Sequence, residues 1–264
     1  MLKLNSIFKT FNAGTVNEKI ALRGVDLQLN QGDFVTVIGG NGAGKSTMLN
    51  AIAGAYDVDE GNILIDGVDV THLPEYKRAK YIGRVFQDPM MGTAATMQIE
   101  ENLALAARRG KARTLRSGIT PAERESYREK LKILGLGLED RMTSKVGLLS
   151  GGQRQALTLL MATLQQPKVL LLDEHTAALD PKTAAKVLEV TERIVSANNL
   201  TTLMITHNMR DAIAYGNRLI MMYDGRIVVD ISGEEKKKLT VEQLLGLFSK
   251  ASGSDEANDK MLLS

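Results

Sequence analysis

The stretch GGNGAGKST, residues 39–47, decides how this sequence is interpreted. It fits the pattern G-x-x-x-x-G-K-[ST] of a phosphate-binding loop, or P-loop. Phe34–Ile38, before it, is a continuous apolar and β-branched run suited to a strand buried on both faces. Lys45–Gly54, after it, is predicted to be a helix that ends in glycine. The alternative is a Gly-rich turn before a surface helix, and the flanking strand and helix argue against it.

Each part of this loop has an expected task in binding ATP. The glycines let backbone N–H groups turn toward phosphate oxygens, and the helix N-terminus adds the positive end of a dipole. Lys45 is expected to reach the β- and γ-phosphates, Ser46 to ligate Mg²⁺, and Thr47 to add a hydroxyl on the α-phosphate side. The predicted nucleotide-binding residues here are Gly39, Gly40, Asn41, Gly42, Ala43, Gly44, Lys45, Ser46 and Thr47.

A second motif, VLLLDE at residues 169–174, ends an apolar run with two carboxylates. In a parallel sheet, ligands bind at the carboxyl ends of the strands. We expect Asp173 to hold Mg²⁺, mainly through its water shell, and Glu174 to orient and deprotonate an attacking water. Alone, the motif could equally be a strand and a polar turn; the P-loop upstream favours the catalytic interpretation.

A third motif, LSGGQ at residues 149–153, opens a predicted helix. An isolated SGG is also a flexible turn with a serine N-cap, but its position between the other two motifs favours a functional reading. A helix N-terminus with a hydroxyl and two bare glycine amides can bind an anion. Because the motif has no lysine of its own, such a site needs one supplied elsewhere.

The rest of the chain indicates an α/β protein. Helical periodicity dominates residues 98–166, and the strands after it are separated by helices in the pattern of parallel βαβ units. The predicted strands, besides 34–38, are 22–29, 62–66, 81–86, 169–172, 201–205, 218–222 and 227–231.

The three motifs in this order resemble the nucleotide-binding subunit of an ABC transporter, over about residues 2–250. The resemblance implies an α/β fold. A P-loop NTPase core with a mostly parallel sheet would carry an N-terminal antiparallel β subdomain and an α-helical subdomain inserted at about 98–166. We therefore predict one ATPase domain at residues 1–250. Residues 251–264 are small and polar, and we expect them to form a disordered tail.

The resemblance also assigns residues that the motifs alone do not. LSGGQ becomes the signature motif, which meets the γ-phosphate held by another subunit. Asp180 matches the loop that crosses the dimer. The signature residues are Ser150, Gly151, Gly152 and Gln153.

Further positions match the family one by one. Phe11 matches the aromatic that stacks on adenine, with a plain core residue as the alternative. Gln87 matches the glutamine that links Mg²⁺ and water to the transporter interface, with a surface polar residue as the alternative. His207 matches the histidine that contacts the γ-phosphate. The predicted catalytic residues are thus Lys45, Gln87, Glu174 and His207, and the predicted metal ligands are Ser46, Gln87 and Asp173.

The chain also departs from the family pattern. Gly40 and His175 stand where many members carry proline, and Ala156 replaces an arginine common after the signature. None of these positions is assigned to chemistry. His72 and His175 are interpreted as structural, and three scattered His with no Cys imply no protein-built metal site. The stretch DPMMGTAATMQIEENLALAARRG looks like ATPases of tryptophan/tyrosine import systems that use a separate solute-binding protein.

The composition of the chain limits the kinds of partner that it can have. The 264 residues carry a net charge of +2, so no global field draws the protein onto nucleic acid. The absence of Cys excludes disulfides and thiol nucleophiles. No stretch is long enough to span a membrane, and no signal-peptide core is found near the N-terminus. We expect a cytoplasmic protein, peripheral on the inner face of the membrane through a permease, paired with a second copy and served indirectly by a solute-binding protein.

Some alternatives stay open. A soluble ABC ATPase of an assembly machine, as in iron–sulfur scaffold systems, would carry the same motifs, and a P-loop kinase would not need LSGGQ. A basic run could be a solvated loop or a contact with a permease or anionic lipid. Lys236–Lys238 is interpreted as solvated. The basic run consists of Arg108, Arg109, Lys111, Arg113 and Arg116.

Overall fold

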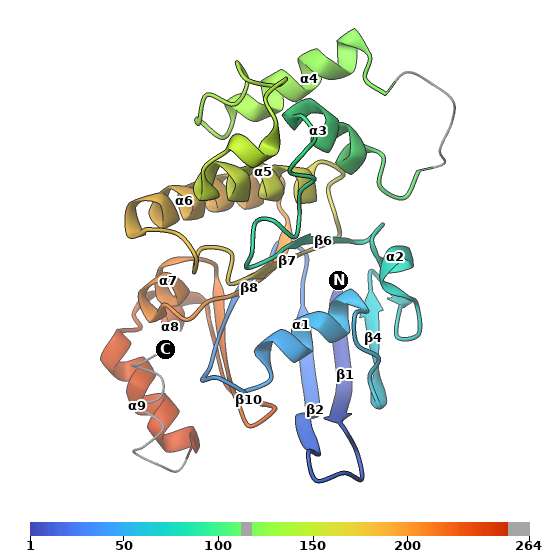
Figure 1. Ribbon diagram of the computed structural model, residues 1–264. Coiled ribbons are helices and arrows are strands. Elements are labelled where there is room, and N and C mark those ends of the chain that lie inside the picture. Colours follow the sequence, from blue (N-terminus) through green and yellow to red (C-terminus); the bar gives the residue numbers. More distant parts are fainter. Residues whose placement is uncertain (112–117, 253–264) are drawn as a thin grey trace.

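The chain folds into two β-sheets with helices around them (Figure 1). The computed structural model describes residues 1–111 and 118–252. An antiparallel sheet has the strand order β2-β1-β4-β5, and a larger sheet has the order β10-β9-β3-β8-β7-β6. The strands are β1 (Leu2–Phe11), β2 (Lys19–Leu29), β3 (Phe34–Ile38), β4 (Glu60–Ile65), β5 (Val68–Asp69), β6 (Ile82–Val85), β7 (Val169–Asp173), β8 (Thr201–Ile205), β9 (Arg218–Tyr223) and β10 (Arg226–Ser232).

In the larger sheet all neighbouring strands are parallel except β10, which is antiparallel to β9. The prediction of a mostly parallel sheet beside an antiparallel one is confirmed. The helices are α1 (Lys45–Ala53), α2 (Glu75–Arg78), α3 (Ile99–Ala107), α4 (Pro121–Lys132), α5 (Gly151–Thr163), α6 (Pro181–Ala197), α7 (Met209–Ala214), α8 (Gly233–Lys237) and α9 (Val241–Ser252), and a 3₁₀ turn covers Val146–Leu148.

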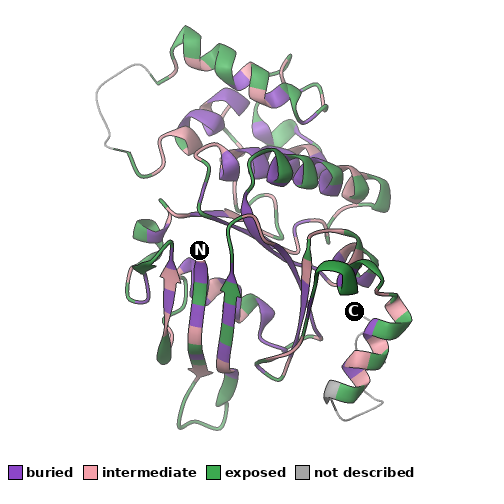
Figure 2. Cartoon of the chain, turned by 180° about the vertical axis from the view of Figure 1, so that it is seen from behind, coloured by how far each residue is buried: buried purple, intermediate pink, exposed green. Residues whose placement is uncertain are grey.

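The period-two alternation of the strands decides which side chains face the P-loop helix. In β7, Val169 and Leu171 join a core shared with α1 and the antiparallel sheet, whereas Leu170 and Leu172 join a core shared with α3, α4, α5 and α6. Asp173 therefore falls on the α1 side of the sheet. Figure 2 shows the difference between the sheets: the parallel strands are mostly buried, and β1 and β2 alternate between buried and more exposed residues.

The predicted helical segment at 98–166 does form helices, and they lie together on one side of the larger sheet (Figure 1). Their apolar residues do not make a separate core. Leu103 of α3, Leu131 of α4 and Leu157 of α5 share one buried cluster with Val85 and Leu172 of the sheet. Movement of these helices would therefore displace side chains that pack on β6 and β7.

A buried arginine fastens the C-terminal end of α1. Arg78 is 1% exposed, and its guanidinium donates to the backbone carbonyls of Ala51 and Ile52 at 2.7 and 3.0 Å. It also donates to two carbonyls of the segment before α2. Gly54 ends the helix with a φ of 84°, and a Cβ there would lie 2.6 Å from the Arg78 side chain. The C-terminal end of the helix that follows the P-loop is thus fixed by Arg78.

Most predicted strand bounds differ from the observed ones by one to three residues, and two further differences concern the ends of the chain. Strand β1 was not predicted, because Ser6 has a φ of 46° and the register shifts between Leu4 and Ile7, which breaks the alternation of apolar residues. At the other end, α9 runs to Ser252, so the predicted tail at 251–264 begins too early. The prediction of disorder for 253–264 lies outside the described residues.

Candidate functional site

The P-loop needs glycine where it passes closest to other backbone. Gly39 has a φ of 150°, and a Cβ there would lie 2.3 Å from the carbonyl oxygen of Met222. Gly44, with a φ of 99°, would place a Cβ 2.7 Å from the carbonyl oxygen of Ala21. At Gly40 a Cβ would meet nothing within 4 Å, so the departure from the family pattern there leaves the packing unchanged.

Lys45 begins α1 and is buried inside the loop. Its Nζ donates to the carbonyl oxygens of Gly39 at 2.6 Å and Gly40 at 3.2 Å. Burial lowers the pKa of Lys45, and the negative charges of Glu174 and Asp173 oppose that shift. The loop therefore holds a cation in place beside two carboxylates.

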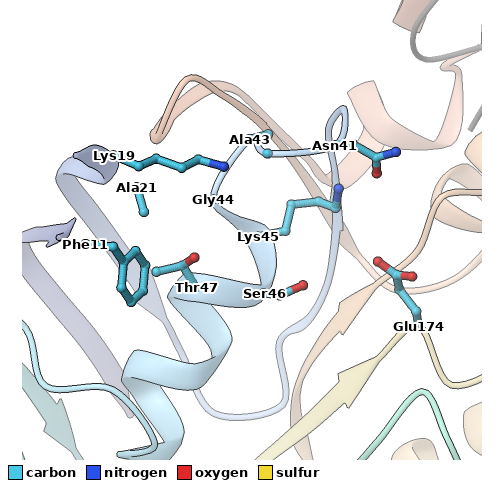
Figure 3. A pocket seen from close by; sticks show the side chains of 11 residues that line it. Phe11, Lys19, Ala21, Asn41, Ala43, Gly44, Lys45, Ser46, Thr47 and Glu174 are labelled. Carbon is cyan, nitrogen blue, oxygen red and sulfur yellow. The ribbon is translucent and has the colours of Figure 1, made fainter. Parts of the chain in front are cut away.

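A pocket opens over the start of α1 (Figure 3). Phe11 lies at one side of it and Glu174 at the other, with the P-loop between them. The pocket therefore brings together residues from β1, β2, the P-loop and the end of β7. The described residues that line it are Phe11, Lys19, Ala21, Asn41, Gly42, Ala43, Gly44, Lys45, Ser46, Thr47 and Glu174.

Glu174 follows β7 in a left-handed backbone conformation, with a φ of 47°. This conformation costs a non-glycine residue about 1–3 kcal/mol, so the surroundings must enforce it. Its N–H donates to the carbonyl of Ile205 in the neighbouring strand, and its carboxylate accepts a hydrogen bond from His207. That bond lowers the pKa of Glu174 below its ordinary value, against the effect of burial.

Asp173, one residue earlier, faces a different cation. The Arg84 guanidinium lies 3.5 Å from its Oδ2 and also donates to Asn50 Oδ1 of α1 at 2.7 Å. Burial raises the pKa of Asp173, while Arg84 opposes that rise. Arg84 therefore ties the end of β7 to the P-loop helix through the side of β6.

The aromatic at the pocket edge is fixed by its neighbours. The rings of Phe11 and Tyr56 meet edge to face, with centroids 5.3 Å apart, and the Lys9 ammonium lies 5.6 Å from the Phe11 centroid. Phe11 is half-buried and one face of the pocket is made by it. A plain core role does not describe this position.

The signature residues form a helix cap away from the pocket. The Ser150 hydroxyl accepts from the Gln153 N–H at 3.3 Å, and the Gln153 side chain accepts from the Ser150 N–H at 3.2 Å. Arg154 donates to the carbonyls of Gly147, before the motif, and Leu149, the first residue of the motif, and contacts Met90. No described pocket residue belongs to this cap, so the chain itself does not bring the signature to its own P-loop pocket.

Among the other predicted site residues, six do not line that pocket either: Gly39, Gly40, Gln87, Asp173, Asp180 and His207. Gln87 is exposed just after β6, and Asp180 is the N-cap of α6, where its carboxylate accepts from the Thr183 N–H at 3.1 Å. The helix after the signature touches the Gln87 loop through Gln155, whose amide donates to the Phe86 carbonyl at 3.0 Å.

Part of the basic run is structural, which corrects both sequence interpretations for two of its members. Arg108 pairs with Glu123 of α4 at 2.9 Å, and Arg109 is half-buried and donates to the carbonyl of Ala162 at 3.4 Å. Lys111 is exposed. Arg113 and Arg116 lie outside the described residues.

Exposure decides three further interpretations from the sequence, those of Lys236, His175 and His72. Lys236 was expected to be solvated but is 2% exposed, and its ammonium donates to the carbonyls of Tyr215 and Gly216, so that expectation is wrong. His175 is buried and contacts Thr191 Oγ1 at 3.1 Å, and His72 is an exposed turn residue, in keeping with structural roles. Ala156 is fully buried.

Sequence reasoning missed four residues around the site: Lys19, Ala21, Asn50 and Arg84. Lys19 and Ala21 lie two apart in β2, and that spacing places both on one face. Their link to the pocket depends on β1, the strand that was not predicted. Arg84 lies in a predicted strand, and its charge inside an apolar run was the available signal.

A P-loop that opens a helix, with two carboxylates at the end of a neighbouring parallel strand, defines a nucleoside triphosphatase of the P-loop class. Residues 22–177 match the family described as ABC transporter. A tyrosine transport ATP-binding protein of Clostridioides difficile (strain R20291) is 44% identical over 251 residues, which cover 95% of this chain and 100% of that protein. The chain belongs to the ABC transporter family and is an ATP-binding subunit of it, with an ATPase domain.

Two further comparisons agree. The spermidine/putrescine import ATP-binding protein PotA of Pasteurella multocida (strain Pm70) is 33% identical, and the alignment covers 93% of this chain but 63% of that relative. The dimeric, post-hydrolysis structure of the ATP-binding cassette MJ0796 bound to ADP and Pi has a TM-score of 0.75 and 31% identity. That match covers 88% of this chain and 98% of the cassette. In the described part of the chain, no helix has the length and apolar character needed to cross a bilayer.

Proposed function

We propose that this chain hydrolyses ATP to power an ABC importer of a small solute, with aromatic amino acids as the substrate class. The observation that carries the ATPase part is the single pocket described above. An aromatic ring, a P-loop with its lysine and a carboxylate meet there in that order (Figure 3). This order suits a base, a phosphate chain and an attacking water.

In this proposal the pocket binds ATP along its length. Phe11 stacks on adenine, the loop amides and Thr47 hold the phosphates, and Lys45 leaves its carbonyl partners to neutralise the β- and γ-phosphates. The lysine needs to move little, because the carbonyls it now contacts belong to the same loop.

The residues present fit Mg²⁺ as the metal. Among the described residues no group of three His, Cys, Asp or Glu could hold a metal alone. Mg²⁺ is usually bound through one or two carboxylates, waters and substrate phosphates, so a site completed by ATP is what this donor set allows. Ser46, Asp173 and, through water, Gln87 would hold it. When bound, Mg²⁺ neutralises charge on the transferred phosphoryl group.

Glu174 is proposed as the general base that takes a proton from the attacking water. Its carboxylate is 12% exposed and is held by His207. His207 would turn from Glu174 to the γ-phosphate when ATP binds and stabilise the developing charge. Glu174 and His207 follow the neighbouring parallel strands β7 and β8, so a ligand bound at this edge of the sheet can contact both side chains.

The signature is proposed to complete the site of a second copy. Ser150, Gly151, Gly152 and Gln153 begin a helix whose N-terminus can bind the γ-phosphate held by the partner, and Asp180 would lie at the dimer crossing. The relative MJ0796 is described as dimeric, which supports this arrangement. Each chain would then contribute half of two active sites.

A permease is proposed as the second partner. Gln87 and the helices between residues 98 and 166 would form the face that transmits ATP-driven closure, since Gln155 joins α5 to the Gln87 loop. The chain would lie on the cytoplasmic face of the membrane, and a solute-binding protein would deliver the substrate to the permease.

The substrate class rests on the tyrosine transport relative, which matches over its whole length. The test is to delete the gene and measure uptake of labelled tyrosine, tryptophan and putrescine. Loss of tyrosine or tryptophan uptake, restored by the wild-type chain, supports the proposal. Loss of putrescine uptake alone contradicts it. Purification of the chain from membranes is a second test, and isolation in a purely soluble complex, without a multi-span protein, would also contradict the proposal.

The ATPase assignment has its own test. Glu174→Gln should lower phosphate release by about 10²–10⁴-fold, as expected for loss of a general base, and should retain ATP binding. Glu60→Gln, an exposed change on β4, is the matched control and should leave turnover unchanged. Near wild-type turnover in the Glu174 variant would remove this residue from the role. Phosphate transfer only to an added acceptor would indicate a kinase instead.

A further inference from the structure

Lys19 is a pocket residue with no assigned role. It is the first residue of β2 and the register partner of Phe11 across the antiparallel pair. Residues opposite each other in such a pair, and residues two apart in one strand, share a face of the sheet. Phe11, Lys19 and Ala21 accordingly line the same side of the pocket.

The Lys19 ammonium lies next to the P-loop. A Cβ built on Gly42 would be 3.6 Å from Lys19 Nζ and would meet no other atom within 4 Å. In Figure 3 the Lys19 side chain extends from β2 toward the loop near Ala43, while Lys45 lies on the Glu174 side. Two lysines thus approach the loop from different sides.

The charge of Lys19 has no partner among the residues that the structure describes. Across residues 1–111 and 118–252, no hydrogen bond or ion pair involves its ammonium. Neighbouring cations do have partners: Lys9 pairs with Asp59 at 2.9 Å, and Arg23 pairs with Asp224 at 3.4 Å. An uncompensated cation at the rim of a phosphate-binding loop attracts an anion.

We propose that Lys19 is a second phosphate-binding lysine, which contacts the polyphosphate chain of a bound nucleoside di- or triphosphate. Its place between Phe11 and the loop puts it beside the phosphates nearer the nucleoside, whereas Lys45 serves those nearer Glu174. The inference rests on the proposed function, because it takes ATP as the ligand of this pocket.

The expected loss of nucleotide affinity on removal of Lys19 follows from the exposure of this side chain. An ion pair between exposed groups is worth up to about 1 kcal/mol, so its loss weakens binding by about fivefold. Such a contact is screened by salt, since the Debye length falls from about 10 Å at 0.1 M to about 3 Å at 1 M. A contact through packing would not respond in this way.

The test is calorimetric titration of the full chain with ATP and with ADP. Lys19→Ala should raise both dissociation constants about fivefold at low salt, and the difference from wild type should shrink in about 1 M salt. Lys19→Arg should bind like wild type. Lys3→Ala is the matched control: it removes one exposed lysine near the other end of the β1–β2 pair and should change nothing.

Three results would overturn the inference. They are unchanged affinity in Lys19→Ala, an equal loss in Lys19→Ala and Lys19→Arg, and a loss that is the same at low and high salt. A wild-type chain that binds no ATP would instead contradict the proposed function, so the two failures can be told apart.

Discussion

His207 Nε2 lies 2.6 Å from Glu174 Oε1, and this hydrogen bond joins the ends of two neighbouring parallel strands. The imidazole N–H donates to the carboxylate and lowers the pKa of Glu174. Both side chains are largely buried, at 22% and 12% exposure. The proposed base is therefore kept ionised and held in place.

Removing His207 should both slow turnover and change its pH dependence. His207→Ala takes away the donor that lowers the pKa of Glu174, so burial raises that pKa. The base must be ionised to act, so the acid limb of the kcat/KM profile, which reports the enzyme before ATP binds, should move to higher pH. Turnover should fall by about 10²–10³-fold, the usual effect of losing one electrostatic contact. An acid limb that stays in place in His207→Ala would contradict the role; His72→Ala is the control.

Phe11 should contribute to affinity for the base of the nucleotide. Stacking on an aromatic ring is worth about 1–3 kcal/mol, so Phe11→Ala should raise the Kd for ATP by about 5- to 150-fold. Phe11→Tyr keeps the ring and should bind like wild type. Fluorescence titration with an ATP analogue checks both. If the alanine variant binds ATP as tightly as wild type, adenine does not lie on this ring.

Arg78 should be required for stability rather than for chemistry. It donates to four backbone carbonyls around the C-terminal end of α1, and its removal leaves buried carbonyls unpaired. Arg78→Met should lower the free energy of unfolding by at least about 3 kcal/mol. Urea denaturation measures this, with Arg128→Met as control, since the Arg128 side chain is 42% exposed and a loss of about 0.5 kcal/mol or less is expected. Equal midpoints for the two variants would refute the anchoring role.

Lys236 should make stability depend on pH on the alkaline side. Burial lowers its pKa from 10.5 to about 8. Between these two values the unfolded chain binds the proton and the folded chain does not, so the free energy of unfolding should rise with pH. Lys236→Met lacks this group, and its unfolding free energy should rise less from pH 8 to 10.5 in urea titrations. Parallel curves for both proteins would show that the ammonium stays charged when folded.

Most of the parallel sheet and the P-loop could be predicted from the sequence, because their signals are local. Phe34–Ile38 and Thr201–Ile205 have the predicted bounds, since runs of apolar and β-branched residues bounded by turns carry their own information. Residues 41–47 of the P-loop and Glu174 line one pocket for a similar reason: parallel strands end at one edge of the sheet.

The parts that were missed depend on contacts between distant segments. Strand β1 is interrupted by the bulge at Ser6, which hides its alternation of apolar residues. Because β1 was not predicted, its pairing with β2, which brings Lys19 beside Phe11, could not be predicted either. Lys236 was misjudged because a run of three lysines suggests solvent, whereas two carbonyls at the end of α7 draw one of them inside.

The signature illustrates a different limit. Ser150–Gln153 cap α5 and lie outside the pocket of their own chain, so the structure of one chain does not reveal their role. Their proposed role requires a second copy. This claim, that two chains share each active site, is central to the account.

Mixing two inactive variants tests the claim most directly. Lys45→Ala removes the P-loop lysine, and Ser150→Arg blocks the signature cap, so neither variant alone should hydrolyse ATP. A heterodimer of the two contains one site in which both halves are intact. The account predicts that phosphate release appears on mixing and is greatest near equal amounts. No recovery at any ratio, with heterodimers verified by differential tagging, would contradict sites shared between chains.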